Sequence, residues 1–125
     1  MKEKMKVVVL EPGKPAYVSE IENSLSSMQK FVGGYIEAIY PFKEMVCIVG
    51  NDNAKLMSMA PNRALIDEDG RVYDFIAGPA FICDCSGEDF ESLSEEQIKR
   101  YMDMYRYIER FALVGETLYV RRYLP

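Results

Sequence analysis

Short apolar runs separated by proline, glycine and asparagine constrain the fold of this chain more than any other feature of its sequence. Lys6–Leu10 is rich in valine, and Glu11–Pro15 ends this run with two prolines and a glycine. Runs of about four to eight residues bounded by such turn residues are typical of β-strands. We therefore expect Lys6–Leu10 to be a buried strand and Ala16–Ile21 to return as its hairpin partner.

The same pattern continues as far as residue 85. Tyr35–Tyr40 alternates in polarity, and Met45–Val49 is apolar on both faces, which is typical of a central strand. Further strands are expected at Lys55–Met59, Val72–Ala77 and Ala80–Cys85. Gly78-Pro79 joins the last two either as a tight turn or as a kink within one long bent strand. We favour the bent strand, because proline suits an edge or a bulge.

A short helix interrupts the strands at residues 25–32. Leu25, Met28 and Val32 recur at helical spacing, and Asn23 or Ser24 precedes them as an N-cap. Gly33-Gly34 ends the pattern, because glycine adopts the left-handed conformation at a helix C-terminus at little cost. This helix of about two turns needs packing to be stable.

The main helix is expected at residues 94–110. Ser94–Gln97 matches a capping box, in which the serine and the glutamine each bind a free backbone amide. An apolar stripe follows, formed by Ile98, Tyr101, Met102, Tyr105 and Ile108. Thr117–Leu124 then alternates as a final strand, expected at a sheet edge or exchanged with a second subunit to give a homodimer.

These elements predict a single α+β domain over residues 1–125. Its sheet is expected to be mixed, mainly antiparallel, with five or six strands. The 94–110 helix would cover one face, the 25–32 helix would lie at an end, and residues 111–125 would form a C-terminal extension. A chain of 125 residues is long enough to bury a core without disulfide bonds.

The residue composition excludes the commonest catalytic sites. There is no histidine, which removes Ser-His-Asp and Cys-His sites, and no Walker-type loop or GxGxxG motif occurs. The cysteines, Cys47, Cys83 and Cys85, lie in apolar runs and are interpreted as buried thiols. A zinc site needs about four ligands, so three thiols plus a carboxylate is the one arrangement left. We expect no metal and no cofactor.

Charge is distributed unevenly along the chain. The net charge is −5, yet residues 98–125 hold six basic and three acidic residues, a net of +3. Residues 66–97 hold ten acids and one base, Arg71. The overall charge disfavours general nucleic-acid binding. The acidic segment 66–97 suggests a face that a protein partner recognises by its charge. No apolar run is long enough for a membrane span or a signal peptide, so a cytoplasmic location is expected.

Pro61–Gly78 holds the densest cluster of candidate binding residues. The candidates are Asn62, Arg63, Asp67, Asp69, Tyr73 and Asp74. The guanidinium of Arg63 can bind a carboxylate or a phosphate in a bidentate manner. The competing interpretation is structural: Arg63 forms a salt bridge with Asp74 or the acidic turn, or caps backbone carbonyls. The turn at Asp67–Gly70 is interpreted as a hairpin turn, because a calcium loop would need carboxylates at positions 65 and 76.

Tyrosines and arginines alternate near the C-terminus. Tyr101 and Tyr105 belong to the apolar stripe of the predicted helix, whereas Tyr107, Arg121 and Arg122 are free to contact a partner. Aromatic and arginine side chains together can stack on single-stranded nucleic acid. Weak nucleic-acid contact by this region is one hypothesis for function.

An ordered set of motifs resembles a known but uncharacterised family. It comprises Glu11–Lys14 (EPGK), Gly33–Ala38, Pro61–Leu65, Asp69-Gly70, Tyr73-Asp74 and Ile76–Gly78, with Asp89-Phe90 and Ser92–Ser94 before the main helix. These resemble the domain-of-unknown-function family numbered 3846, found in Firmicutes, their phages and conjugative elements. The likeness covers most of residues 6–110. It implies a cytoplasmic accessory protein of a mobile element, and it implies no catalytic residue.

The sequence therefore favours a non-enzymatic protein-interaction module of a mobile element. Its predicted site is the Asn62-Arg63 corner with the acidic turn and Asp74, and its partner is a protein. The alternative is a small-ligand or nucleotide-handling enzyme with Arg63 as anion clamp and Asp74 or Glu37 as base. That alternative requires a pocket that contains Arg63 beside a carboxylate of raised pKa.

Overall fold

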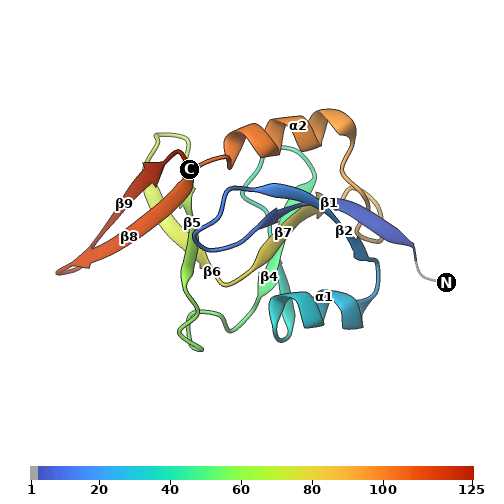
Figure 1. The fold of residues 1–125 in the computed structure, drawn as a ribbon, viewed down its shortest axis with the longest axis horizontal. Coiled ribbons are helices and arrows are strands. Elements are labelled where there is room, and N and C mark those ends of the chain that lie inside the picture. Colours follow the sequence, from blue (N-terminus) through green and yellow to red (C-terminus); the bar gives the residue numbers. More distant parts are fainter. Residues whose placement is uncertain (1–2) are drawn as a thin grey trace.

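The computed structural model describes residues 3–125, and a five-stranded sheet lies at its centre (Figure 1). Met1 and Lys2, the start of the charged N-terminal segment, lie outside the described residues. The strand order is β2-β1-β7-β4-β3, and all neighbours are antiparallel. The strands are β1 (Lys4–Leu10), β2 (Tyr17–Glu22), β3 (Ile36–Ile39), β4 (Val46–Asn51) and β7 (Ala80–Asp84). The central sheet thus has five strands, within the predicted five or six, but it is antiparallel throughout and not mixed as predicted.

Two hairpins form separate two-stranded sheets beside this central sheet. One consists of β5 (Pro61–Ile66) and β6 (Val72–Ala77), the other of β8 (Ile108–Val114) and β9 (Thr117–Tyr123). β6 and β7 do not pair with each other and belong to different sheets, so they are two strands and not one long bent strand. Gly78, with φ of 73°, makes the change of direction between them.

The prediction of a strand at Lys55–Met59 is wrong. Asn51–Met59 instead forms a series of turns, in which the amides of Ala54, Met57 and Met59 bind carbonyl oxygens three to five residues earlier. We call residues 51–59 the 51–59 loop. Carbonyl oxygens of the loop itself, together with Asn51 Oδ1, accept these amides and that of Asn53, so the segment needs no strand partner.

The first helix, α1 (Leu25–Val32), follows the prediction at both ends. Ser24 Oγ accepts a hydrogen bond from the Ser27 amide at 3.2 Å, and Gly33 ends the helix with φ of 82°. The main helix, α2 (Glu95–Met104), begins with the predicted capping box, since Ser94 and Gln97 bind each other's backbone amides. No helix within residues 3–125 is both long and apolar enough to cross a membrane.

α2 ends at Met104, six residues before the predicted end of the helix. The carbonyl oxygen of Tyr105 accepts hydrogen bonds from the Ala16 amide at 3.1 Å and from Arg63 Nη2 at 3.2 Å. In a longer helix this oxygen would bind the amide of residue 109. Tertiary hydrogen bonds therefore replace the helical ones, and Ile108 begins β8.

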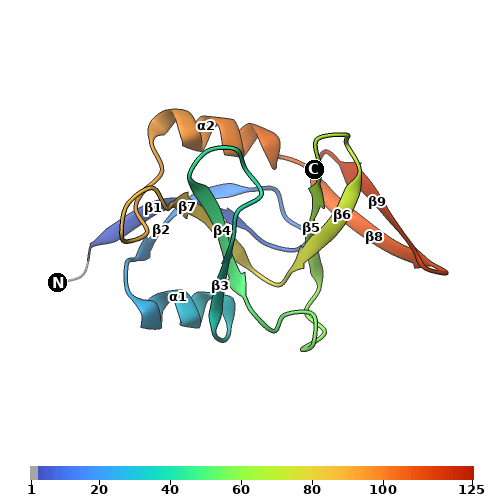
Figure 2. The ribbon, with the colours of Figure 1, turned by 180° about the vertical axis from the view of Figure 1, so that it is seen from behind.

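The two helices cover opposite faces of the central sheet, as Figure 2 also shows. Alternate residues of β1, β4 and β7 point to each face. On one face, Val8, Ile48 and Ile82 pack with Tyr101 and Tyr105 of the α2 region. On the other face, Val9, Cys47 and Phe81 pack with Met28 and Val32 of α1. The prediction that α1 lies at an end of the sheet is therefore wrong.

Candidate functional site

Asn62 sits in a β-bulge at the start of β5. Pro61 pairs with Ala77 and Arg63 with Ile76, so one residue is extra on this strand. A bulge breaks the alternation of side chains along a strand. As a result Asn62 and Arg63 are both fully buried. Asn62 Nδ2 donates to the carbonyl oxygens of Leu10 and Gly78, each at 2.8 Å, and so joins β5 to the end of β1 and to the kink after β6.

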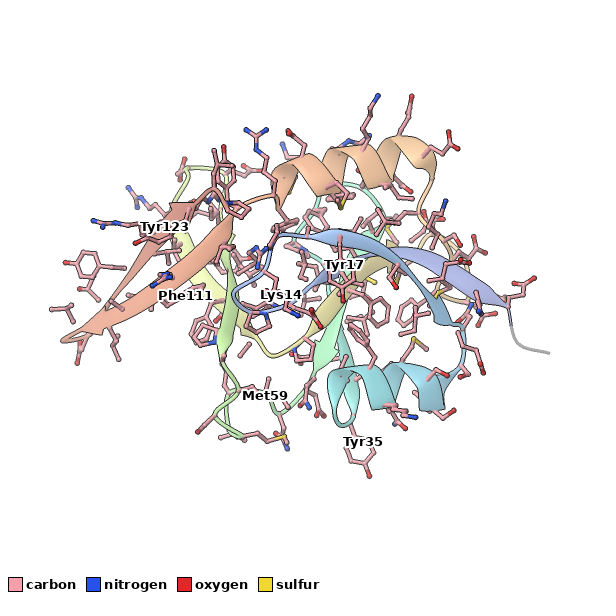
Figure 3. The ribbon with its side chains drawn as sticks, in the orientation of Figure 1. Lys14, Tyr17, Tyr35, Met59, Phe111 and Tyr123 are labelled. Atoms are coloured by element: carbon pink, nitrogen blue, oxygen red, sulfur yellow. The ribbon has the colours of Figure 1, made fainter. Side chains whose placement is uncertain are left out.

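The guanidinium of Arg63 binds backbone carbonyls from three separate parts of the chain. Nη2 donates to the carbonyl oxygens of Lys14 at 2.7 Å and Tyr105 at 3.2 Å. Nη1 donates to Asn62 Oδ1 at 2.9 Å, to the Asn62 carbonyl at 3.1 Å and to the Glu11 carbonyl at 3.4 Å. The turn at residues 11–14 passes beside β5, and Lys14 is labelled in Figure 3. Arg63 therefore caps carbonyls, as the structural interpretation predicts, and is not free to clamp an anion.

A buried carboxylate that the sequence analysis missed stands beside this cluster. Glu109 is buried on β8, and its Oε1 accepts the Ala64 amide at 2.8 Å. Its Oε2 lies 3.8 Å from Nε of Arg122 on β9. Burial lowers the pKa of Arg63, and the negative charge of Glu109 opposes that shift. The two-residue link Gly115-Glu116 between apolar runs was the sequence signal for this hairpin, since glycine at the first turn position is typical of such turns.

The remaining predicted residues lie on the exposed part of the β5–β6 hairpin. Asp67 Oδ1 accepts the amides of Asp69 and Arg71 at 3.0 and 2.9 Å, which shapes the hairpin turn predicted at this position. Asp69 and Tyr73 are exposed. Asp74 pairs with Leu65 across the hairpin. The structure thus places Asn62 and Arg63 at the buried end and the acidic turn at the opposite end, so the predicted residues do not form one surface.

A cleft lies between the central sheet and the β5–β6 hairpin, and residues of both β4 and β6 line it. It has a volume of about 160 Å³, and the 51–59 loop forms part of its wall. The apolar part of its lining includes Ile39, Ile48, Leu65, Ile76 and Ala80. The polar part includes Glu37, Asp52, Asn53, Lys55 and Asp74. Arg63 does not line it.

Lys55 and Asp74 form an ion pair at the rim of this cleft. Lys55 Nζ lies 2.5 Å from Asp74 Oδ1 and 4.5 Å from the centre of the Phe75 ring. Partial burial raises the pKa of Asp74, but hydrogen bonds from Lys55 and the Phe75 amide outweigh it, and the pKa lies below its ordinary value. A general base near neutral pH needs a raised pKa. Asp74 is therefore poorly suited to act as one.

Contacts of the buried Asn51 and the half-buried Met59 hold the 51–59 loop in place. Asn51 Nδ2 donates to the Val32 carbonyl at 3.1 Å, and its Oδ1 accepts the Asn53 amide at 2.7 Å. Met59 packs so closely on Gly78 that a Cβ there would lie 2.6 Å from the methionine sulfur. Leu56, at the crown of this loop, is 85% exposed. These contacts anchor the two ends of the loop, and Leu56 between them exposes an apolar side chain at the cleft.

The cysteines lie together on the α1 face. Cys47 and Cys83 pair directly across β4 and β7, with their sulfurs 3.8 Å apart, and both are buried. Cys85 is half-buried, and all three are free thiols. Within residues 3–125, no group of three or more His, Cys, Asp or Glu side chains has an arrangement that could hold a metal ion.

A family model described as a domain of unknown function, DUF3846, matches residues 5–106. The chain belongs to this family. The DUF3846 match includes the central sheet from Met5 onward, both helices, Arg63 with its partners as far as Tyr105, and the cleft, but it ends before β8. No curated protein and no solved structure is significantly similar to the chain.

Proposed function

We propose that this DUF3846 protein is a non-enzymatic binding module, and that the cleft between β4 and β6 receives a segment of a protein partner. The observation that carries the proposal is the cleft itself: apolar residues line it, and the carboxylates at its edge, those of Glu37, Asp52 and Asp74, are exposed. Concave apolar surfaces with a few polar groups are the usual form of binding sites. The exposed Leu56 beside it extends the apolar surface.

The charges at the rim define the kind of segment that fits. Glu37, Asp52 and Asp74 contribute three carboxylates against one ammonium group, Lys55. Lys55 neutralises Asp74, whereas Glu37 and Asp52 form no salt bridge with any residue of 3–125. A partner segment would therefore place an apolar side chain in the cleft and a lysine or arginine beside Glu37 and Asp52.

The cellular setting of the proposal rests on the family resemblance and on the thiols. The resemblance of its motifs to proteins of phages and conjugative elements supports an accessory role in a mobile element. Three free cysteines support a reducing compartment, the cytoplasm. The position of the coding sequence tests the first point: a location outside any phage or conjugative element would contradict it.

Selection from a library of short random peptides tests the binding function. We expect the full chain to enrich peptides in which an apolar residue adjoins lysine or arginine. The variants Leu56→Ser and Glu37→Gln/Asp52→Asn should lose this enrichment. Leu25→Ser, on α1 and 57% exposed, is the matched control and should keep it. Enrichment of no common motif, or equal enrichment by the cleft variants, would contradict the proposal.

A further inference from the structure

The β8–β9 hairpin stands away from the rest of the molecule, and it lies outside the residues matched by the family model (Figure 1). Its inner face is attached to the body. Glu109 accepts the Ala64 amide, and the ring of Phe111 lies 5.7 Å from that of Phe75. The cleft does not include any residue of this hairpin. The hairpin is therefore a separate surface, and its role is independent of the function proposed for the cleft.

The outer face of the hairpin is defined by its register. Directly paired residues share a face, and neighbours along a strand point to opposite faces. Glu109, Phe111, Leu118, Val120 and Arg122 thus lie on the inner face. The outer face is formed by Ile108, Arg110, Ala112, Val114, Thr117, Tyr119, Arg121 and Tyr123, and it contains no acidic residue.

Arg110 and Arg121 are directly opposite each other on this outer face, and both are exposed. Neither forms a salt bridge with any residue of 3–125. Like charges in direct cross-strand pairs destabilise a sheet. Stability alone therefore disfavours this pair, and a bound anion would remove the repulsion.

Aromatic rings flank the two arginines. Tyr119, two pairs further toward the tip and so the next residue of its strand on this face, is 57% exposed. Tyr123, labelled in Figure 3, is two pairs toward the base, and the Arg110 guanidinium lies 5.3 Å from the centre of its ring. Arg106 stacks on Tyr107 in the same way just before β8, at 5.0 Å. The face thus alternates flat rings with guanidinium groups, which can themselves stack.

We propose that the outer face of the β8–β9 hairpin binds single-stranded nucleic acid. Arg110 and Arg121 would bind phosphates, and Tyr119 would stack on an unpaired base. Exposed aromatic rings on a sheet with neighbouring cations are suited to single strands, whose bases are free to stack. A duplex offers only its phosphates to such a surface. An acidic protein segment could pair with the two arginines, but its carboxylates would not stack on the exposed ring of Tyr119.

The acidic remainder of the chain limits the affinity. Outside residues 98–125 there are nine basic and seventeen acidic residues, a net of −8. Binding should therefore be weak, roughly 10⁻⁴ to 10⁻⁶ M, and salt-dependent, since each phosphate contact on a single strand adds about −0.7 to the slope of log affinity against log salt. Two arginines predict a contribution of about −1.4 to that slope.

Fluorescence anisotropy with a labelled oligo-thymidine strand tests the proposal on the full chain. Arg110→Gln/Arg121→Gln should weaken binding about 25-fold at about 0.1 M salt, because each phosphate contact contributes a factor of about five relative to 1 M salt. The charge-matched control Arg71→Gln/Lys99→Gln removes two exposed cations elsewhere and should have a much smaller effect. Tyr119→Leu should weaken binding about tenfold, through lost stacking, whereas Tyr35→Leu, at another exposed tyrosine, should not.

Three results would overturn the proposal. They are no binding by the unaltered chain, equal losses in the hairpin and control variants, and binding to poly-glutamate as tight as to the strand. The last result would assign the face to an acidic protein. The double arginine variant should melt within a few degrees of the unaltered chain, because removal of a like-charge pair offsets loss of the Arg110–Tyr123 contact. A melting curve of each hairpin variant, Tyr119→Leu included, separates unfolding from loss of the site.

Discussion

Arg63 and Tyr105 meet at the junction between β5 and the end of α2. Nη2 of Arg63 donates to the Tyr105 carbonyl at 3.2 Å, and the Ala16 amide donates to the same oxygen at 3.1 Å. This oxygen, at the end of α2, therefore links the helix to both the turn after β1 and the start of β5. The arginine is a structural residue that holds three segments together.

Replacing Arg63 should destabilise the protein strongly. Lysine keeps a charge but cannot reach carbonyls on several sides at once, and methionine leaves them all unpaired. We expect Arg63→Lys to lower the free energy of unfolding by about 2 kcal/mol and Arg63→Met by about 3 kcal/mol. Urea denaturation measures both. The exposed Arg71→Lys is the control, and an Arg63→Met variant as stable as this control would contradict the structural role.

Glu109→Ala should loosen the attachment of the C-terminal hairpin. The substitution leaves the buried Ala64 amide without an acceptor and removes a negative charge that favours the charged form of Arg63. The expected loss is about 2 to 3 kcal/mol. Hydrogen exchange of the Ala64 amide should accelerate with it. Glu116→Ala, at the exposed tip of the same hairpin, should change neither quantity.

Gly78→Ala and Gly70→Ala form a matched pair of substitutions. Comparing them separates the backbone strain of a positive φ from the steric clash of a new Cβ with its neighbours. Both glycines have positive φ, 73° and 79°, but a Cβ at Gly70 would meet nothing within 4 Å. At Gly78 it would lie 2.6 Å from the Met59 sulfur. We expect Gly70→Ala to cost about 1 kcal/mol and Gly78→Ala about 2 kcal/mol. Thermal unfolding compares them, and equal costs would show that Met59 moves aside freely.

The Lys55–Asp74 pair should be visible in a pH titration. The folded-state pKa of Asp74 lies below its ordinary 3.8, so the pair stabilises the fold above that pH and its contribution is lost as the pH falls through the folded-state pKa. Both side chains are about half exposed, so the effect on stability should be a few tenths of a kcal/mol. In a carboxyl-carbon NMR titration, Lys55→Met should raise the midpoint of Asp74. Lys30→Met, on α1, should leave it in place.

The three cysteines should differ from free cysteine in their reaction with iodoacetamide. Burial raises the pKa of the Cys85 thiol to about 11, compared with an ordinary 9.0. Because only the thiolate reacts, alkylation of Cys85 at pH 8 should be about a hundredfold slower than that of free cysteine. Cys47 and Cys83 have no exposed surface and should react only in denaturant. Mass spectrometry of the digested protein resolves the three sites.

Elements with local signals could be predicted from the sequence. Ser24 and Gly33 bound α1, and Ser94 and Gln97 begin α2, because these residues bind backbone groups within their own helix turn. The turn at Asp67–Gly70 is set by its own side chains in the same way. The end of α2 was not predictable, since no breaker follows Met104 and the helix is stopped by Ala16 and Arg63, far away in the chain.

The candidate site was only partly predictable for the same reason. The sequence pointed to Arg63 as a residue that needs partners. Its acceptors are carbonyl oxygens, which every residue carries, so nothing in the residue types indicated that those of Glu11, Lys14 and Tyr105 converge on it. The cleft could not be predicted either, because it depends on contacts between segments far apart in the sequence. Ile39 and Leu65 line the same cleft only once the β5–β6 hairpin packs against the central sheet.

The attachment of Glu109 to Ala64 has a consequence for how the domain is delimited. The family model matches the chain only as far as residue 106. The buried side chain of Glu109 lies beyond this limit, and it accepts a hydrogen bond from the Ala64 amide of β5. We therefore expect the cooperative folding unit of this chain to extend past the residues that the family model matches. A truncation placed at the family boundary would remove a structural component of the family core together with the hairpin.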